Sequence, residues 1–493
     1  MIHRNIAVAL ASLLLLTSCA ASEPKPLSSL TKYQTQELKW RDCYGNYQCS
    51  NLLVPIDYQD LSVGAFSLAL LRYQALDQDR RIGSLVVNPG GPGASGVDYA
   101  YNAELIVGPE ILERFDIVGF DPRGVGDSAP IKCLNDSETD ASFAADSKPD
   151  NDTEFALLIS DAKEYFAKCA TNTKHLTAYS TLNSARDLEI LRSVLGDKKL
   201  NFLGKSYGTY LGTLYAELFP ENVGRFVLDG AVDPNSNNRE AMIGQATGFE
   251  TALNAFISDC LKRKNCALTG DLLTARNQVS DLLAKTSITP LKSRSGRDVT
   301  ESLVLVGIAS ALYDSASDWP VLRDAFKEAT LGSGESFLSL ADQYAGRQED
   351  GSYLGNENDA LQVIDCLDQK EIDTISAFKN GFAEFSEKAP IFGPYLAYSG
   401  LACRYLPNSG SMEQIEIKNF KTTPVLIIGT TRDPATPYKW AQSLAKVFSS
   451  SILITLDGDG HTGHGRGSIC VDSVVDRYLL TGVTPKAGLF CAN

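Results

Sequence analysis

The chain has 493 residues, and its 45 Lys and Arg against 60 Asp and Glu give a formal net charge of −15 at pH 7. This acidic balance argues against nucleic acid or an anionic membrane surface as a partner. With 44% hydrophobic residues, the chain can bury a large core, and its length suits a main domain with a substantial insertion.

The first 18 residues have the features of a secretory signal. Arg4 supplies a positive charge, residues 6–16 form an apolar stretch, and Leu16-Thr17-Ser18-Cys19 supplies a cleavage site. The apolar stretch is too short to span a bilayer as a helix. Its ending resembles a bacterial lipoprotein signal, which predicts lipidation of Cys19; an ordinary signal peptide ending near a cysteine is the alternative. Residues 19–38 are expected to form a tether, so that the protein meets the membrane only through lipidated Cys19.

Eleven cysteines are present, and ten remain when Cys19 is set aside. An even number fits structural disulfides in an extracytoplasmic compartment. Proximity in sequence suggests five pairs, although ten cysteines allow many other pairings. The suggested pairs are Cys43–Cys49, Cys133–Cys169, Cys260–Cys266, Cys366–Cys403 and Cys470–Cys491. The four histidines and the lack of a C-x-x-C pair argue against a metal site, and no cofactor is expected.

Strand patterns alternate with helical patterns, which is typical of an α/β protein. Apolar runs predict strands at 84–88, 115–120, 200–205, 225–230, 424–429 and 452–456. From about residue 235 to residue 419, between the fourth and fifth of these runs, the patterns are helical. We therefore expect one mostly parallel sheet, formed by residues 39–234 and 421–493, with an inserted helical cap over residues 235–420. Two consecutive domains would leave the last two strands without a sheet of their own.

A G-x-S-x-G motif, Gly204-Lys205-Ser206-Tyr207-Gly208, follows the predicted strand 200–205 and precedes a helical pattern that ends at Pro220. A strand, a sharp turn and a helix around this motif are typical of the α/β-hydrolase fold. The turn would expose the Ser206 hydroxyl and direct the Tyr207 N–H toward a forming oxyanion. A chance serine between two of the 39 glycines is the alternative.

A serine nucleophile requires a base. His461 and His464 follow the last predicted strand, where α/β-hydrolases place that base. His461 is favoured because it is closer to the strand and follows Gly460, which leaves His464 as a neighbouring or surface residue. His175 precedes the serine in the chain, contrary to the usual order.

The base in turn requires an orienting carboxylate. Asp433, after the penultimate predicted strand, is favoured, and Asp229 is either the alternative acid or a buried structural carboxylate. A second oxyanion donor is expected from the loop after strand 84–88, where Pro89-Gly90-Gly91-Pro92-Gly93 has side-chain-free N–H groups. Gly91 is the specific choice, together with Tyr207.

Six segments resemble those of the actinobacterial tripeptidyl aminopeptidases, secreted α/β-hydrolase serine peptidases related to proline iminopeptidases. The segments are 88–93, 115–124, 204–209, 227–230, 431–434 and 460–462. The resemblance implies a triad of Ser206, Asp433 and His461, and removal of tripeptides from peptide substrates with a free N-terminus. Proline iminopeptidases have His-Gly-Gly-Pro-Gly, whereas here Asn88-Pro89 precedes the glycines, which favours the tripeptidyl branch.

Cleavage near a free N-terminus needs a carboxylate that holds the substrate ammonium at a set distance from the nucleophile. Asp365 and Asp368, on either side of Cys366, are candidates in the expected cap. Solvated surface carboxylates beside a disulfide are the alternative. Two other functions remain open: a carboxylesterase or lipase-like hydrolase of the cell envelope, and a non-catalytic binding lipoprotein. No oligomeric state is predicted.

Overall fold

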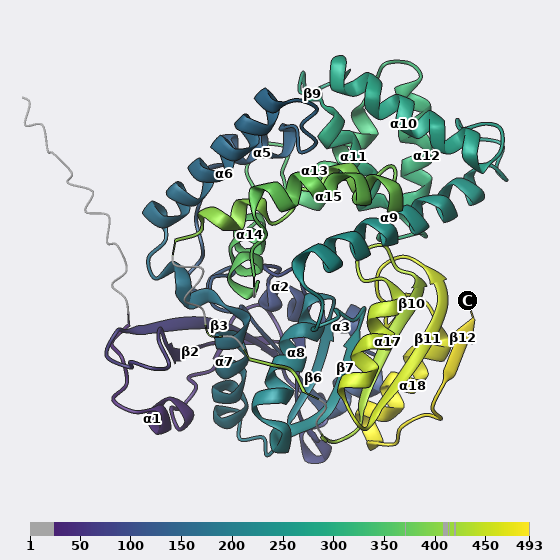
Figure 1. Cartoon of the computed structure of the whole chain (residues 1–493). Coiled ribbons are helices and arrows are strands. Elements are labelled where there is room, and N and C mark those ends of the chain that lie inside the picture. Colours follow the sequence, from purple (N-terminus) through teal and green to yellow (C-terminus); the bar gives the residue numbers. More distant parts are fainter. Residues whose placement is uncertain (1–23, 370, 408–412, 414, 419–420, 493) are drawn as a thin grey trace, which may run out of the picture.

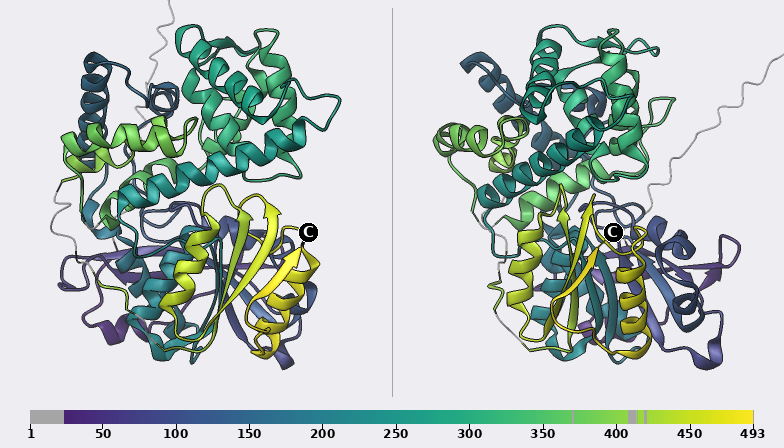
Figure 2. Two further views of the ribbon diagram at one scale, coloured as in Figure 1. Left: turned by 45° about the vertical axis from the view of Figure 1, so that its right-hand side comes forward. Right: turned by 90° about the vertical axis from the view of Figure 1, so that its right-hand side faces the viewer.

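The computed structural model describes residues 24–369, 371–407, 413, 415–418 and 421–492. The expected signal peptide and Cys19 lie outside the described residues. The described chain forms two layers: a twisted sheet flanked by helices, and a group of helices above the carboxyl edge of that sheet (Figures 1 and 2).

The main sheet has ten strands in the order β1-β2-β3-β5-β4-β6-β7-β10-β11-β12. The strands are β1 (Arg41–Asp42), β2 (Tyr47–Pro55), β3 (Ala65–Tyr73), β4 (Gly83–Asn88), β5 (Phe115–Phe120), β6 (Leu200–Lys205), β7 (Val223–Asp229), β10 (Val425–Arg432), β11 (Ser451–Asp459) and β12 (Leu489–Ala492). The pairs from β1 through β3 to β5 are antiparallel, and the pairs from β5 to β12 are parallel. The chain has an α/β-hydrolase fold with one mostly parallel sheet, as expected. The last strands join the same sheet as the earlier ones, because β10 pairs directly with β7 although nearly two hundred residues separate them.

The central strands are apolar on both faces because helices cover both faces. Every residue of β4 and β5 is buried, as in other parallel sheets enclosed between helices. One face packs against α1 (Leu30–Gln34), α7 (Thr181–Val194), α8 (Tyr207–Leu218) and α17 (Tyr438–Val447). The other packs against α2 (Gly96–Tyr101), α3 (Ala103–Ile106), α4 (Pro109–Arg114) and α18 (Ile469–Thr481). Short 3-10 helices lie at Gln78–Arg80, Leu176–Tyr179, Pro220–Asn222 and Leu401–Tyr405.

The inserted cap has its own apolar core, which includes the fully buried side chains of Phe256, Val304 and Leu322. Its helices are α9 (Asn238–Cys260), α10 (Leu272–Ile288), α11 (Glu301–Ala311), α12 (Asp318–Ala329), α13 (Glu335–Ala345), α14 (Glu357–Asp368), α15 (Ile375–Lys388) and α16 (Gly393–Leu396). A two-stranded hairpin, β8 (Leu291–Lys292) with β9 (Asp298–Val299), is a feature that the sequence patterns did not predict.

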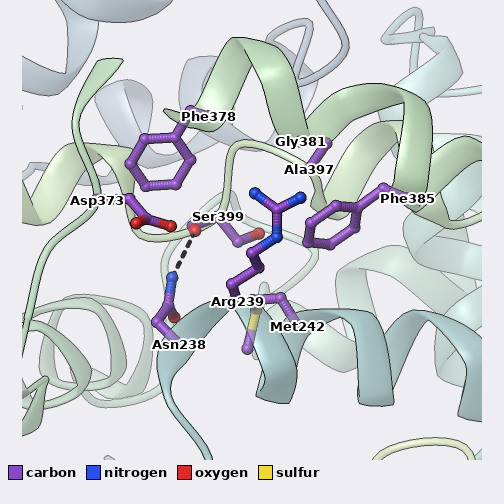
Figure 3. Close-up of a pocket in the computed structure, with 9 residues that line it drawn as sticks. All are labelled: Asn238, Arg239, Met242, Asp373, Phe378, Gly381, Phe385, Ala397 and Ser399. Carbon is purple, nitrogen blue, oxygen red and sulfur yellow. Dashed lines mark hydrogen bonds between the residues drawn. The ribbon is translucent and has the colours of Figure 1, made fainter. Parts of the chain in front are cut away.

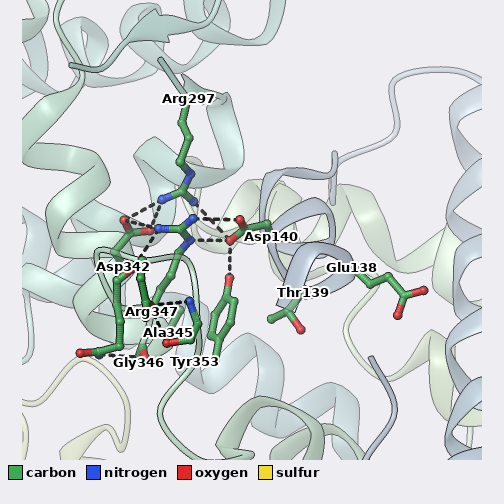
Figure 4. A network of polar contacts seen from close by, with 12 residues as sticks. Glu138, Thr139, Asp140, Arg297, Asp342, Ala345, Gly346, Arg347 and Tyr353 are labelled. Carbon is green, nitrogen blue, oxygen red and sulfur yellow. Dashed lines mark hydrogen bonds and ion pairs between the residues drawn. The ribbon is translucent and has the colours of Figure 1, made fainter. Parts of the chain in front are cut away.

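Two further helices from the first half of the chain, α5 (Asp136–Ala144) and α6 (Asp152–Asn172), lie in the cap layer (Figures 1 and 2). Figure 4 shows how α5 is attached: Asp140 accepts hydrogen bonds from Arg347 Nε (2.6 Å) and the Tyr353 hydroxyl (2.7 Å). Arg297 joins the same group through Asp342, at 2.7 Å. The cap therefore consists of two separate stretches of chain, rather than the insertion at 235–420 alone.

All five cysteine pairs suggested by sequence proximity are disulfides in the structure. Cys366–Cys403 fastens the end of α14 to the 3-10 helix Leu401–Tyr405. Cys133–Cys169 fastens α6 to the loop that precedes α5.

The expectation of a tether up to residue 38 is wrong for its described part, residues 24–38. These residues include α1, and Tyr33 on that helix is fully buried against the sheet. Gln36 accepts a hydrogen bond from the Leu53 N–H and donates one to its carbonyl, both at 2.9 Å. The stretch is fixed because one buried aromatic ring and one paired amide anchor it. Within the described ranges, no helix is both long and apolar enough to cross a membrane.

Candidate active site

The candidate site lies where the parallel strands end. Neighbouring strands β4, β6, β7, β10 and β11 are followed, respectively, by the glycine loop, Ser206, Gly230, Asp433 and the loop that carries His461. Parallel strands place their carboxyl ends at one edge of a sheet, and open α/β sheets form their sites there. Residues more than two hundred positions apart thus meet beneath the cap.

Ser206 occupies the sharp turn between β6 and α8. Its backbone has φ 53° and ψ −125°, a strained conformation for a residue with a side chain. The flanking glycines are required by space: a Cβ on Gly204 would lie 2.5 Å from the Gly208 carbonyl oxygen, and one on Gly208 would lie 2.6 Å from Asn88 Oδ1. The turn therefore has the strain and the crowding expected of a nucleophile elbow.

His461 and Asp433 are paired. His461 Nδ1 lies 2.9 Å from Oδ1 and 3.0 Å from Oδ2 of Asp433. The carboxylate is fully buried and also accepts the backbone N–H groups of Ala435, Thr436 and Thr462, at 2.8–3.0 Å. With these donors around it, the carboxylate is held in one orientation and fixes the imidazole.

Ser206 and His461 both lie next to Asp229 and Gly230 at the end of β7. The Ser206 N–H donates to the Asp229 carbonyl at 2.8 Å, and a Cβ on Gly230 would lie 3.3 Å from His461 Cε1. Among the described residues, the Ser206 hydroxyl forms no hydrogen bond with His461. Contacts of this kind are often loose without substrate and tighten when it binds.

Asp229 is bound to the backbone of the histidine loop rather than to an imidazole. Its carboxylate accepts the N–H groups of Gly463 (2.8 Å) and His464 (2.9 Å). Burial raises the pKa of Asp229, and the nearby Lys205 ammonium and these N–H donors partly offset that rise. This matches the structural interpretation of Asp229 rather than that of an alternative acid.

The other two histidines inside the described chain lie elsewhere. His464 is buried, and burial, with a smaller contribution from Lys205, lowers its pKa to about 3. It is therefore neutral, and its carbonyl accepts a 2.7 Å hydrogen bond from Lys205 Nζ. His175 packs against Phe66 on β3, with ring centroids 6.4 Å apart, toward the antiparallel part of the sheet.

The glycine loop after β4 packs directly against the serine turn. A Cβ on Gly90 would lie 2.9 Å from Ser206 Cβ and 3.2 Å from the Tyr207 nitrogen. Gly90 has φ +107° and Gly91 has φ +103°, backbone conformations that favour glycine. The Gly90 N–H donates to Asn88 Oδ1 at 3.1 Å. Because this N–H is already bonded, the next N–H that the loop could offer to an oxyanion is that of Gly91.

Helix α14 of the cap brings carboxylates close to the start of α8. Asp368 accepts hydrogen bonds from the Thr181 N–H (2.9 Å) and hydroxyl, and that hydroxyl also contacts the Tyr207 hydroxyl. Asp365 is exposed at the surface, and partial desolvation, with the nearby Asp368 charge, raises its pKa to about 7. Burial likewise raises the pKa of Asp368 to about 7. Asp368 is half-buried and bonded to Thr181, whereas Asp365 is exposed, so the alternative of a surface carboxylate stays open for Asp365.

Sequence reasoning did not find Glu357 or Tyr313. Glu357 begins α14, and its carbonyl oxygen would lie only 2.7 Å from a Cβ on Gly93, so the start of the helix packs closely against the glycine loop. Desolvation raises the pKa of Glu357. Tyr313, just beyond α11, lies against His461 with ring centroids 5.1 Å apart. The helical spacing of Glu357, Asp365 and Asp368 could have indicated a shared acidic face, whereas no sequence pattern marks Tyr313.

A small pocket in the cap, shown in Figure 3, contains none of the candidate site residues. It lies between α9 and α15, where Arg239 Nη2 pairs with Glu384 Oε2 at 2.6 Å. Asn238 Nδ2 donates to the Ser399 carbonyl at 3.0 Å. These contacts join two cap helices, which suits a structural role.

Comparison with known proteins agrees with this geometry. The family model for the alpha/beta hydrolase fold matches residues 83–467, and the chain therefore belongs to the α/β-hydrolase family. It is similar to serine protease Hip1 of Mycobacterium tuberculosis, with 36% identity over 480 residues, covering 92% of this chain and 91% of that protein. Carboxylesterase B of the same organism is 36% identical over 455 residues, covering 90% and 86%. Tripeptidyl aminopeptidase of Streptomyces coelicolor is 31% identical over 474 residues, covering 92% and 86%. Together, these relatives and the site identify a serine hydrolase.

Proposed function

We propose that this serine hydrolase is a peptidase that removes tripeptides from the free N-termini of peptides. The observation that carries the proposal is the His461–Asp433 pair, with its fully buried carboxylate, next to the strained turn at Ser206. The relatives named as a protease and as a tripeptidyl aminopeptidase support a peptide substrate.

The mechanism is acyl transfer. Ser206 Oγ attacks the scissile carbonyl carbon while Nε2 of His461 accepts its proton. Asp433, on Nδ1, holds the imidazole in the required tautomer and stabilises the imidazolium. The imidazolium then protonates the leaving amine, and a water molecule, deprotonated by the same histidine, hydrolyses the acyl-enzyme.

The N–H groups of Tyr207 and Gly91 form the oxyanion hole. Tyr207 is the first residue of α8, so its N–H points out of the helix beside Ser206. The bond from the Gly90 N–H to Asn88 holds the glycine loop against the serine turn. The loop thus presents the Gly91 N–H to the same oxygen.

The carboxylates of Asp365 and Asp368 receive the substrate ammonium. The contact of Asp368 with the Thr181 hydroxyl, which in turn contacts the Tyr207 hydroxyl next to Ser206, supports this role. Within the described part of the chain, neither carboxylate forms an ion pair, and a substrate ammonium would supply one. The distance between this pair and Ser206 would set how many residues are removed.

Steady-state kinetics with three substrates tests the proposal: a tripeptide anilide with a free amine, its N-acetylated form, and a short acyl ester. The proposal expects the free amine to be preferred, and Ser206→Ala to abolish turnover and fluorophosphonate labelling. Preference for the acetylated peptide would contradict the aminopeptidase assignment. Preference for the ester would favour the second candidate, a carboxylesterase, which the similarity to carboxylesterase B supports.

We also propose that the protein acts outside the cytoplasm and is anchored through lipidated Cys19. The five disulfides support the compartment, and the signal at residues 1–18 supports export. Phase partition in Triton X-114 tests the anchor. The wild-type protein should enter the detergent phase and Cys19→Ser should remain in the aqueous phase; aqueous wild-type protein would contradict anchoring.

A further inference from the structure

The cap contacts the backbone of the loop that carries His461. The carbonyl of Tyr313 accepts the His461 N–H at 2.9 Å and Arg466 Nη2 at 2.9 Å. This approach requires glycine before the histidine, because a Cβ on Gly460 would lie 2.8 Å from the same carbonyl oxygen. Gly460 also has φ +110°, which favours glycine.

The ring of Tyr313 packs against the imidazole itself. The two rings are 5.1 Å apart and inclined at 76°, an edge-to-face arrangement. On its other sides the Tyr313 ring contacts Phe249 of α9 and Tyr344 of α13, at centroid distances of 6.0 and 5.9 Å. Two cap helices therefore support the ring that meets His461.

Two further bonds hold the cap segment in place. Asp314 pairs with Arg466 at 3.0 Å, and the Ser315 hydroxyl donates to the Asp459 carbonyl at 3.2 Å. Three consecutive cap residues, 313–315, are thus bonded to the strand end and loop that position the imidazole. A cap moved away from the sheet would lose all of these contacts together.

We propose that Tyr313 is a positioning residue for His461, supplied by the cap, so that docking of the cap is a condition for an active base. This inference rests on the proposed role of His461. The ring limits rotation of the imidazole about its side-chain bonds, and the carbonyl fixes its backbone. Catalysis depends steeply on such placement, because an error of about 1 Å can cost about 10²-fold in rate.

The test compares kcat and KM of Tyr313→Leu, Tyr313→Phe and wild type on the free tripeptide anilide. We expect Tyr313→Leu to lower kcat about 10- to 100-fold with KM nearly unchanged, since the base is misplaced and substrate contacts remain. Tyr313→Phe keeps the ring and should retain wild-type kcat. The matched control is Phe326→Leu, another aromatic residue of the cap core, which packs on Phe256 and Phe337. It should lower Tm but leave kcat of the folded enzyme unchanged.

Unchanged kcat in Tyr313→Leu, or an equal loss of kcat in Phe326→Leu, would overturn the inference. If Tyr313→Leu does not fold, Arg466→Met decides, because it removes the bonds to both Tyr313 and Asp314 from the exposed side of the loop. Arg466→Met should lower kcat, as Tyr313→Leu is expected to do. An unchanged kcat would again overturn the inference. His461→Ala separates the two claims: if it retains activity, the proposed function fails, whereas an inactive His461→Ala with a fully active Tyr313→Leu refutes only the positioning role.

Discussion

His461 Nδ1 lies within hydrogen-bond distance of both carboxylate oxygens of Asp433, at 2.9 and 3.0 Å. Asp433→Asn would keep the shape of the side chain but would place an amide donor where three backbone N–H groups and the imidazole all need an acceptor. We expect kcat/KM to fall about 10⁴-fold, because the imidazole is then held in the wrong tautomer. Asp457→Asn, which alters a carboxylate bound to Arg432 nearby, is the control and should retain activity. Similar losses in both variants would contradict the role of Asp433.

Asp365→Asn should separate substrate binding from chemistry. Loss of the charge removes a partner for the substrate ammonium, so KM for the free tripeptide anilide should rise about 10-fold or more while kcat changes less. Kinetics on a short acyl ester, which has no ammonium, should remain unchanged. Glu349→Gln removes an exposed cap carboxylate and serves as the control. An equal rise of KM for both substrates would show that Asp365 acts on structure rather than on the amine.

The same substitution should also affect stability in a defined pH range. The pKa of Asp365 is raised to about 7, well above the usual range for an aspartate, so the native state holds its proton more tightly than the unfolded state. The stability of the wild-type protein therefore falls as pH rises from about 4 through 7. Asp365→Asn should unfold at the same Tm or higher than wild type at pH 8, measured by calorimetry. A lower Tm at pH 8 would contradict the raised pKa of Asp365.

Substrate binding should depend on pH through the acidic pair. Asp365 and Asp368, whose pKa values are both about 7, are neutral below that pH and charged above it. KM for the free-amine substrate should therefore decrease as pH rises from 6 to about 7.5, until the substrate amine itself begins to lose its proton near pH 8. KM for an acetylated substrate should lack this decrease. A parallel decrease for both substrates would point to a different titrating group.

Removal of the Cys366–Cys403 disulfide should weaken both stability and amine recognition. The bond closes a loop with a sequence separation of 37, for which chain entropy alone predicts a loss of about 4 kcal/mol in the free energy of unfolding. The double Ser variant should show a lower Tm and a higher KM for the free amine, because the bond fixes the helix that carries both aspartates. Removing Cys260–Cys266, with a separation of 6, should cost about 2 kcal/mol and leave KM unchanged. A change of KM in both variants would contradict a specific role for the first bond.

The parallel part of the sheet could be predicted because its strands are continuous apolar runs, and each run ends in a conspicuous loop. The antiparallel strands β2 and β3 were not predicted, since their apolar residues are interrupted by polar ones: Ser50, which is buried, Asn51, which is exposed, and Arg72, which is half-buried. The five disulfides followed from proximity along the chain. The anchoring of residues 24–38 did not, because it depends on the burial of Tyr33 and on the bonds between Gln36 and Leu53.

For the candidate site, the order of motifs along the chain indicated the serine, the histidine and the acid. It did not decide whether Asp433 or Asp229 is that acid. Only the hydrogen bonds in the structure distinguish the two carboxylates. Asp229 accepts the backbone N–H groups of Gly463 and His464, whereas Asp433 contacts the imidazole of His461. The contact of Tyr313 with His461 spans nearly 150 positions between two regions without a shared motif. Such contacts depend on how the cap docks, which no local pattern encodes.

The membership of α5 and α6 in the cap has a practical consequence for protein engineering. Deleting residues 235–420 would leave Asp140 without Arg347 and Tyr353, and would expose the faces of two helices that remain attached to the sheet. A capless enzyme or a chimaera with another lid would need two coordinated excisions, joined at the ends of β5 and β7. A single cut at the apparent insertion would produce an aggregation-prone remnant instead of an open enzyme.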